Sequence, residues 1–344
     1  MILAVPTPFA KIRHMLCRVA ALSLAASCAF AANQIGHIEF FGYKGINPEA
    51  VRRALPFKPG DPVTAQIKQQ ARAAVKDATG RDATDVAIVC CEDDGGQTIF
   101  IGLAGESYHP FAYNPAPAGA ARVSPQLNEI MRRLDKAMVA AVRKGGDAAR
   151  EDDSRGYALS NDRATRALEL SLHDYATKHE DELLSVLESS SDENHRQIAA
   201  QSIGYGTQTP RQIEALVRAA RDPSDGVRND ATRAIGVLLR SDLEYAKKIP
   251  LVTFVQMMNS GIWTDRNKAS SVLEPMSRSR EPQVLEQIRT GVLDSLIEMA
   301  RWKTNHAIFA RYILARVAGI SEDQMARYLT GPLDLILNRL HPPE

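Results

Sequence analysis

Apolar residues recur at helical spacing through the C-terminal half of the chain, in a pattern that repeats. Counting from Arg228, a small residue follows three positions later, an apolar residue seven later and a glycine eight later. Arg196 begins a second copy of this pattern, and Arg266 and Ala307 begin two copies that lack the glycine. Residues three and seven positions along lie on one face of an α-helix, so each copy predicts a helix with a narrow apolar stripe.

Each copy follows a second segment of helical periodicity. These upstream segments are residues 181–187, 212–220, 251–258 and 284–299. The four copies lie 32, 38 and 41 residues apart, as expected of stacked helix pairs. One pair cannot cover both of its apolar faces, whereas stacked pairs bury a continuous core. The pattern therefore predicts an all-α array over residues 161–340, with an ordinary non-repetitive helical domain as the alternative.

The residues of the clearest copy resemble a known repeat. The line from Asp222 to Gly236 reads Asp-Pro-Ser-Asp-Gly-Val-Arg-Asn-Asp-Ala-Thr-Arg-Ala-Ile-Gly, which looks like a HEAT repeat, an armadillo-type helical repeat. The resemblance is good at Arg196 and Arg228, weaker at Arg266 and poor at Ala307. It implies an α-solenoid whose groove holds another protein.

Residues 32–106 predict a small α+β domain of order β-α-α-β-β. The pattern places strands at 37–41, 85–91 and 98–103, and helices at 48–55 and 64–77 with Asn47 and Thr64 as their N-caps. The run Leu-Pro-Phe-Lys-Pro-Gly-Asp-Pro-Val-Thr, which ends at Thr64, resembles a POTRA (polypeptide-transport-associated) domain. That resemblance implies peptide binding along a sheet edge. A purely structural cap is the alternative.

Residues 107–160 predict a proline-rich linker followed by an amphipathic helix at 125–144, capped by Ser124. The linker holds Tyr108, Phe111 and Tyr113, more aromatic residues than a free linker needs, so we expect it to lie along a neighbouring surface. The acidic stretch that begins at Glu151 predicts a solvated turn rather than a Ca²⁺ site, because its spacing fits no EF-hand loop.

The N-terminus has the features of a secretory signal. Basic residues precede an apolar run over 19–30, and small residues stand at 29 and 31. We expect cleavage after Ala31 or Ala32 of a signal peptide at 1–31, which gives a periplasmic or secreted chain with no transmembrane segment. A retained membrane anchor and a lipoprotein through Cys28 are alternatives. For Cys90 and Cys91, one buried and one exposed thiol is the favoured interpretation, and a disulfide is the other.

The composition and motifs indicate binding rather than catalysis. The 344 residues carry 42 basic and 41 acidic side chains, which argues against a nucleic-acid partner. No catalytic or phosphate-binding motif is present, and no cofactor or metal is predicted. An enzyme of hydrolase or lyase type, with a site built from His173, His179 and the region near Asp152, is the alternative. A zinc site of these two histidines with His195 has little support from their spacing.

Five residues are candidates for contact with a protein or peptide partner. Arg196, Arg228 and Arg266 recur at equivalent positions and would form a ladder that could bind carboxylates or phosphates. The favoured interpretation makes them structural instead, each tied to an acidic residue such as Asp192, Asp225 or Asp265. Trp263 and Trp302 would be core residues or interface anchors. The sequence thus predicts an exported, non-catalytic scaffold of the cell envelope, and it specifies neither the partner nor the oligomeric state.

Overall fold

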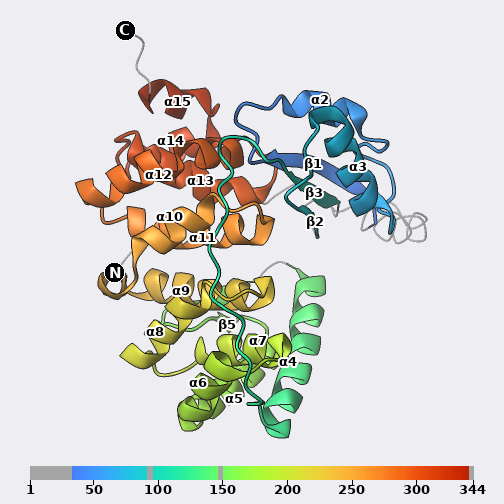
Figure 1. Cartoon of the computed structure of the whole chain (residues 1–344). Coiled ribbons are helices and arrows are strands. Elements are labelled where there is room, and N and C mark those ends of the chain that lie inside the picture. Colours follow the sequence, from blue (N-terminus) through green and yellow to red (C-terminus); the bar gives the residue numbers. More distant parts are fainter. Residues whose placement is uncertain (1–32, 91–95, 146–149, 341–344) are drawn as a thin grey trace, which may run out of the picture.

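The computed structural model describes residues 33–90, 96–145 and 150–340, so the predicted signal peptide lies outside the described residues. Figure 1 shows a small α+β domain at one end of a long helical array. An extended segment leaves this domain and runs along the array to its opposite end. There the chain turns back and builds the array in the reverse direction.

The N-terminal domain has the predicted order of elements, β-α-α-β-β. These are β1 (Ile35–Phe41), α2 (Pro48–Ala54), α3 (Ile67–Thr79), β2 (Val86–Val89) and β3 (Gln97–Gly102). β3 lies in the middle of the sheet, parallel to β1 and antiparallel to β2. The predicted cap Asn47 accepts a hydrogen bond from Glu49 N. The predicted cap Thr64 is wrong, because α3 starts later, after Gln66, and Thr64 belongs to the preceding turn.

The C-terminal region is the all-α array of helix pairs that the periodicity predicts. The first helices of the pairs are α6 (Glu180–Ser189), α8 (Pro210–Ala219), α10 (Leu251–Met258) and α12 (Pro282–Ala300). The second helices are α7 (Glu193–Ile203), α9 (Asp225–Ser241), α11 (Trp263–Ser277) and α13 (Ile308–Val317). The array opens with α5 (Arg163–Lys178), which Asp162 caps, and closes with α14 (Met325–Thr330) and α15 (Asp334–Leu340).

The array is curved, with the second helices on the inside. α7, α9, α11 and α13 pack against one another in succession, whereas α8 and α10 have little direct contact. The 3₁₀ helix η2 (Leu243–Lys248) connects α9 to α10 at that point. Because the second helices are the more closely spaced row, they line the inner face of the curve.

The chain between the two domains forms α4 (Pro125–Lys144) and a short hairpin, β4 (Glu151–Asp152) with β5 (Leu159–Ser160). Ser124 caps α4 as predicted, through a hydrogen bond from Leu127 N. α4 packs against α5 at the N-terminal end of the array. The acidic stretch is therefore a structured hairpin, not the free turn that its sequence predicts.

Two further observations concern the sequence predictions. None of the described helices combines the length and the apolar character needed to cross a bilayer. Cys90 is disulfide-bonded, whereas Cys91 lies outside the described residues. The favoured interpretation of two thiols, one buried and one exposed, is therefore wrong for Cys90, and the disulfide alternative is correct for it.

Candidate functional site

The N-terminal domain is fixed to the array through Phe100 of β3. Its ring packs against the start of α11 and against the turn that follows α12. Its ring lies 5.0 Å from that of Trp263 and 4.8 Å from that of Trp302, centroid to centroid. The Trp302 indole N–H donates to Phe40 O at 2.9 Å, and the backbone N–H of Trp263 donates to Asp85 at 3.0 Å. Both tryptophans are therefore interface residues, and the interface is within the chain.

A single buried carboxylate, Glu298 of α12, holds the same junction together. It accepts the backbone N–H groups of Gly42, Tyr43 and Lys44 at 2.7, 2.9 and 2.9 Å. It also accepts the Ser107 hydroxyl at 2.6 Å and a guanidinium N–H at 3.2 Å. Three successive N–H groups form a concave anion site of the kind called a nest. The turn that forms it needs glycine at position 42, where φ is +70° and a Cβ would lie 2.4 Å from Leu103 O.

The three predicted ladder arginines are buried and each binds an acidic residue of the following pair. Arg196 binds Asp222 through two hydrogen bonds of 2.8 and 2.9 Å. Arg228 binds Asp265 in the same way, at 2.8 and 3.3 Å. Arg266 donates to Glu298 at 3.2 Å, and burial lowers the pKa of its guanidinium to about 10.

Each of these arginines also binds a backbone carbonyl in the turn before its own helix. The acceptors are Ser190, Asp222 and Ser260, at 2.9, 2.8 and 2.7 Å. The ladder thus joins one helix pair to the next and fixes the turn within each pair. The structural interpretation is confirmed for these contacts, with Asp265 as predicted, and with Asp222 in place of Asp192 or Asp225. Partner contact by the arginines and the two tryptophans stays an untested prediction.

Residues 107–123, which we call the strap, lie along the row of turns between the first and second helices. Backbone N–H groups of His109, Asn114 and Gly119 donate to carbonyls of three successive turns, at 2.9, 2.7 and 2.7 Å. The acceptors are Asn259, Arg221 and Ser189, so the strap runs opposite to the array (Figure 1). The predicted surface contact of the linker is confirmed.

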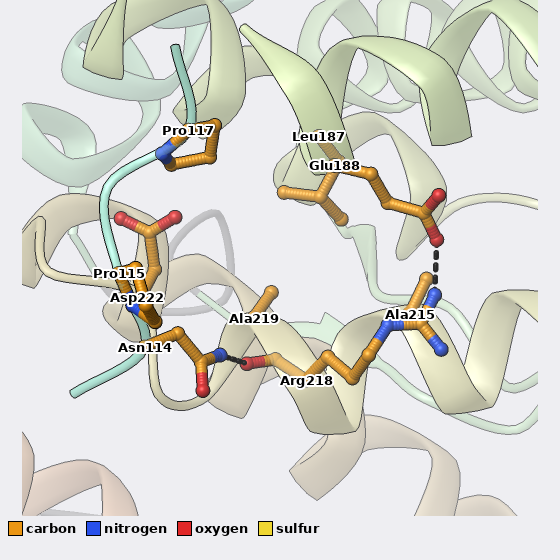
Figure 2. Close-up of a pocket in the computed structure, with 9 residues that line it drawn as sticks. All are labelled: Asn114, Pro115, Pro117, Leu187, Glu188, Ala215, Arg218, Ala219 and Asp222. Atoms are coloured by element: carbon orange, nitrogen blue, oxygen red, sulfur yellow. Dashed lines mark hydrogen bonds and ion pairs between the residues drawn. The ribbon is translucent and has the colours of Figure 1, made fainter. Parts of the chain in front are cut away.

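Aromatic side chains and prolines of the strap complete this contact. The guanidinium of Arg221 lies 4.8 Å from the centre of the Phe111 ring, and that of Arg228 lies 4.3 Å from the Tyr113 ring. Further along, the strap closes one side of a pocket of about 360 Å³ against α6 and α8. Figure 2 shows Asn114 at its rim, donating to the carbonyl of Arg218 at 2.9 Å, while the Arg218 guanidinium pairs with Glu188.

The register of the strap can be tested by amide hydrogen exchange. We expect the N–H groups of His109, Asn114 and Gly119 to exchange at least tenfold more slowly than those of Ala116 and Ala118, because the first three are hydrogen-bonded to the array. Residue-resolved exchange by NMR measures the difference. Equal rates along the strap would show that it is not seated on the turns.

The inner face of the array holds a polar pocket of about 280 Å³ between α4 and the second helices. Its polar lining comes from Gln201 of α7, Asn229, Asp230 and Arg233 of α9, and Lys268 of α11. Two of the three acidic residues of the hairpin, Glu151 and Asp153, pair with Arg233 and Arg240 of α9.

The two remaining charged groups of the pocket have shifted pKa values. Burial raises the pKa of Asp230, and its described hydrogen-bond donors are two amides, those of Gln197 and Asn229, at 3.1 and 2.8 Å. Burial, helped by the neighbouring Arg233, lowers the pKa of the Lys268 ammonium to about 8. Within the described ranges, Lys268 forms no side-chain hydrogen bond or ion pair.

The array of helix pairs with its arginine ladder can now be compared with known proteins. Residues 163–253 match the family model for HEAT repeats. The matched HEAT repeats span α5 to the start of α10, which confirms the predicted resemblance for that part of the chain. No curated protein matches the chain, and nothing in these comparisons supports the resemblance of the N-terminal domain to POTRA.

The solved structures that match this chain include designed armadillo repeat proteins, at low TM-scores and low identity. One, in complex with the peptide (KR)4, has a TM-score of 0.37 and 16% identity, covering 54% of this chain and 89% of its own. Another is a computationally designed armadillo repeat protein for modular peptide recognition. It has a TM-score of 0.37 and 16% identity, and the match covers 62% of this chain and 90% of its own.

The histidines of the alternative enzymatic hypothesis have separate local roles. His173 Nδ1 lies 2.6 Å from Tyr205 O, and its ring stacks on Tyr157. His179 stacks on Tyr175, whereas His195 accepts the N–H of Val123 at 3.3 Å. Among the described residues no group of three or more metal-ligating side chains could hold an ion. Asp152 pairs instead with Arg166, at 3.5 Å, and none of the contacts described for the histidines is with Asp152.

Sequence reasoning missed Glu298, although it organises the junction. The only signal in the sequence was its position, 32 residues after Arg266, where the ladder requires an acid of the next pair. The acids that pair with Arg196 and Arg228 lie at other spacings, so this position alone does not single out Glu298.

Proposed function

We propose that this chain is an exported, non-catalytic scaffold of the cell envelope that holds a protein or peptide partner on the inner face of its helical array. HEAT repeats commonly act as scaffolds that bind proteins or peptides. The strap already occupies the row of turns, and the N-terminal domain covers the last pairs. The inner face between α4 and that domain is the surface left for a partner.

One observation carries this proposal: a row of amide side chains along the inner helices. The residue after each ladder arginine is Gln197, Asn229 or Asn267, one for each successive second helix. All three side chains are half-buried. Gln197 and Asn229 each give one N–H to Asp230, and Asn267 Oδ1 lies 3.3 Å from His306 Nδ1. Amides both donate and accept hydrogen bonds, so the other N–H and carbonyl groups of the row suit the repeating backbone of a bound chain.

The N-terminal sheet offers a second contact, at β2. The outer edge of β1 is closed, because the carbonyls of Ile38 and Phe40 accept hydrogen bonds from Arg52 and Trp302 at 2.8 and 2.9 Å. An added strand would therefore pair with β2. Export is supported by the basic and apolar pattern of residues 1–31.

Affinity capture tests the proposal. The full chain is expressed in a bacterial host, and the protein recovered from the periplasm is expected to begin at Ala32 or Asn33. Used as bait on an envelope extract of the source organism, it should recover a specific protein. Gln201→Trp on the inner face should reduce that recovery at least fivefold, because the larger, uncharged side chain fills the pocket.

The control is Glu214→Trp on the exposed side of α8, which should leave recovery unchanged. Circular dichroism melts confirm that both variants are folded. Retention of the leader, no specific protein in the eluate, or equal recovery with both variants would each contradict a part of the proposal.

A further inference from the structure

The acidic hairpin shows which chemistry the inner face accepts. Glu151 pairs with Arg233, and Asp153 pairs with Arg240 Nε at 2.7 Å. Both arginines belong to α9, so an acidic segment of the chain itself is already seated on the second helix of one repeat. The contact is between partly exposed groups on the two sides, as in a docked peptide rather than in a core.

The next helix along, α11, offers a basic side chain without a counterpart. Lys268 lines the same pocket as Arg233. Four charged groups surround it: Arg233 and Arg240 repel its ammonium, while Asp230 and Glu151 attract it. None of the described residues forms an ion pair with Lys268. One terminal nitrogen of Arg233 donates a hydrogen bond to Glu151. No described residue accepts a hydrogen bond from the other N–H groups of Arg233.

The two acids near Lys268 do not satisfy it. Glu151 is held by Arg233, and Asp230 is held by the amides of Gln197 and Asn229. A carboxylate that enters the pocket would meet an unpaired ammonium and an open guanidinium edge. Hydrogen bonds between charged partners are stronger than neutral ones, and a guanidinium favours two-point contact with a carboxylate.

We propose that this pocket binds a carboxylate side chain of an acidic partner segment, with Lys268 and the open edge of Arg233 as its donors. The hairpin already places acidic side chains against α9, and the partner segment would place the next one against α11. The inference rests on the proposed function, because it names the chemistry of the partner that the inner face holds.

The titration of Lys268 gives the proposal a direct readout. Its pKa of about 8 reflects burial and the repulsion by Arg233. A bound carboxylate favours the charged ammonium and should raise this pKa, so binding should take up protons at pH 8 and weaken as the pH rises further.

The test uses the mature protein and acetylated, amidated tetraglutamate as the probe, with tetraglutamine as the neutral control. NMR of the Lys268 side chain follows its pKa, and fluorescence anisotropy of the labelled peptide follows binding. We expect a higher pKa with tetraglutamate only, and at least tenfold weaker binding by Lys268→Met. Lys247→Met, at an exposed lysine of η2, is the matched control and should bind like the wild type.

Three results would overturn the proposal. These are a Lys268 pKa that tetraglutamate leaves unchanged, equal binding by Lys268→Met, and a pKa rise with free glutarate as large as with the peptide, which would indicate a small-acid site. Failure of envelope capture with intact tetraglutamate binding would contradict the proposed partner and leave this site standing. Successful capture without a response of Lys268 would contradict this inference alone.

Discussion

Glu298→Ala is expected to lower the free energy of unfolding by about 3–5 kcal/mol, because it removes one partner of a buried ion pair. The change leaves the guanidinium of Arg266 buried without a carboxylate. It also leaves the N–H groups of Gly42, Tyr43 and Lys44 without their acceptor. Since these groups belong to α11 and to the turn after β1, the junction should loosen as a whole.

Urea unfolding followed by tryptophan fluorescence measures this effect, because Trp263 and Trp302 both lie at the junction. Asp294→Ala is the matched control on the same helix. Asp294 pairs with Lys44 at 2.8 Å, but both side chains are 49% exposed, so we expect little change. A Glu298→Ala protein as stable as Asp294→Ala would show that the carboxylate does not hold the domain in place.

Arg228→Met should cost a similar amount, about 3–5 kcal/mol, for the complementary reason. Asp265 is fully buried and would keep only the Ser260 hydroxyl as a donor, at 2.7 Å. The carbonyl of Asp222 would lose its bond as well. The damage should appear in the HEAT repeats themselves, and thermal unfolding followed by far-UV circular dichroism measures it.

The double variant Arg228→Met/Asp265→Leu removes both charges. It therefore separates the destabilisation caused by an unpaired buried charge from the net contribution of the ion pair to stability. Two apolar side chains of similar volume often replace a buried pair at little cost, so the double variant should be more stable than Arg228→Met alone. Arg211→Met, at a pair with Asp181 on the exposed surface, is the control and should not change the melting temperature measurably. A double variant no more stable than Arg228→Met would show that the buried charge of Asp265 does not account for the loss.

The sequence predicted the array well because its signal is periodic. Each helix pair repeats a stripe of small and apolar residues, and all four first helices lie where the periodicity placed them. The ladder arginines followed from the same alignment. Their acids were only partly predicted, because the acid that reaches back from the next pair lies in the turn for Asp222 and inside the helix for Asp265.

The junction could not be predicted, because its parts have no local signature. Glu298 has the spacing of an ordinary polar residue on a helix, and Trp302 looks like a core residue of the array. Their partners, the turn after β1 and the carbonyl of Phe40, lie more than two hundred positions away. The docked hairpin was missed for the same reason, since an acidic stretch alone does not indicate which basic residues it will meet.

The N-terminal domain is synthesised well before the last helix pairs, on which it packs. The N-terminal domain leaves the ribosome first, and any N-terminally led export would also deliver it first. Yet Trp263, Glu298 and Trp302, which receive it, follow only on the order of ten seconds or more later at ordinary rates of synthesis. Until then the Phe100 ring lacks the tryptophans that bury it. A nascent or truncated chain therefore exposes an apolar surface that favours aggregation and that a chaperone would be needed to shield.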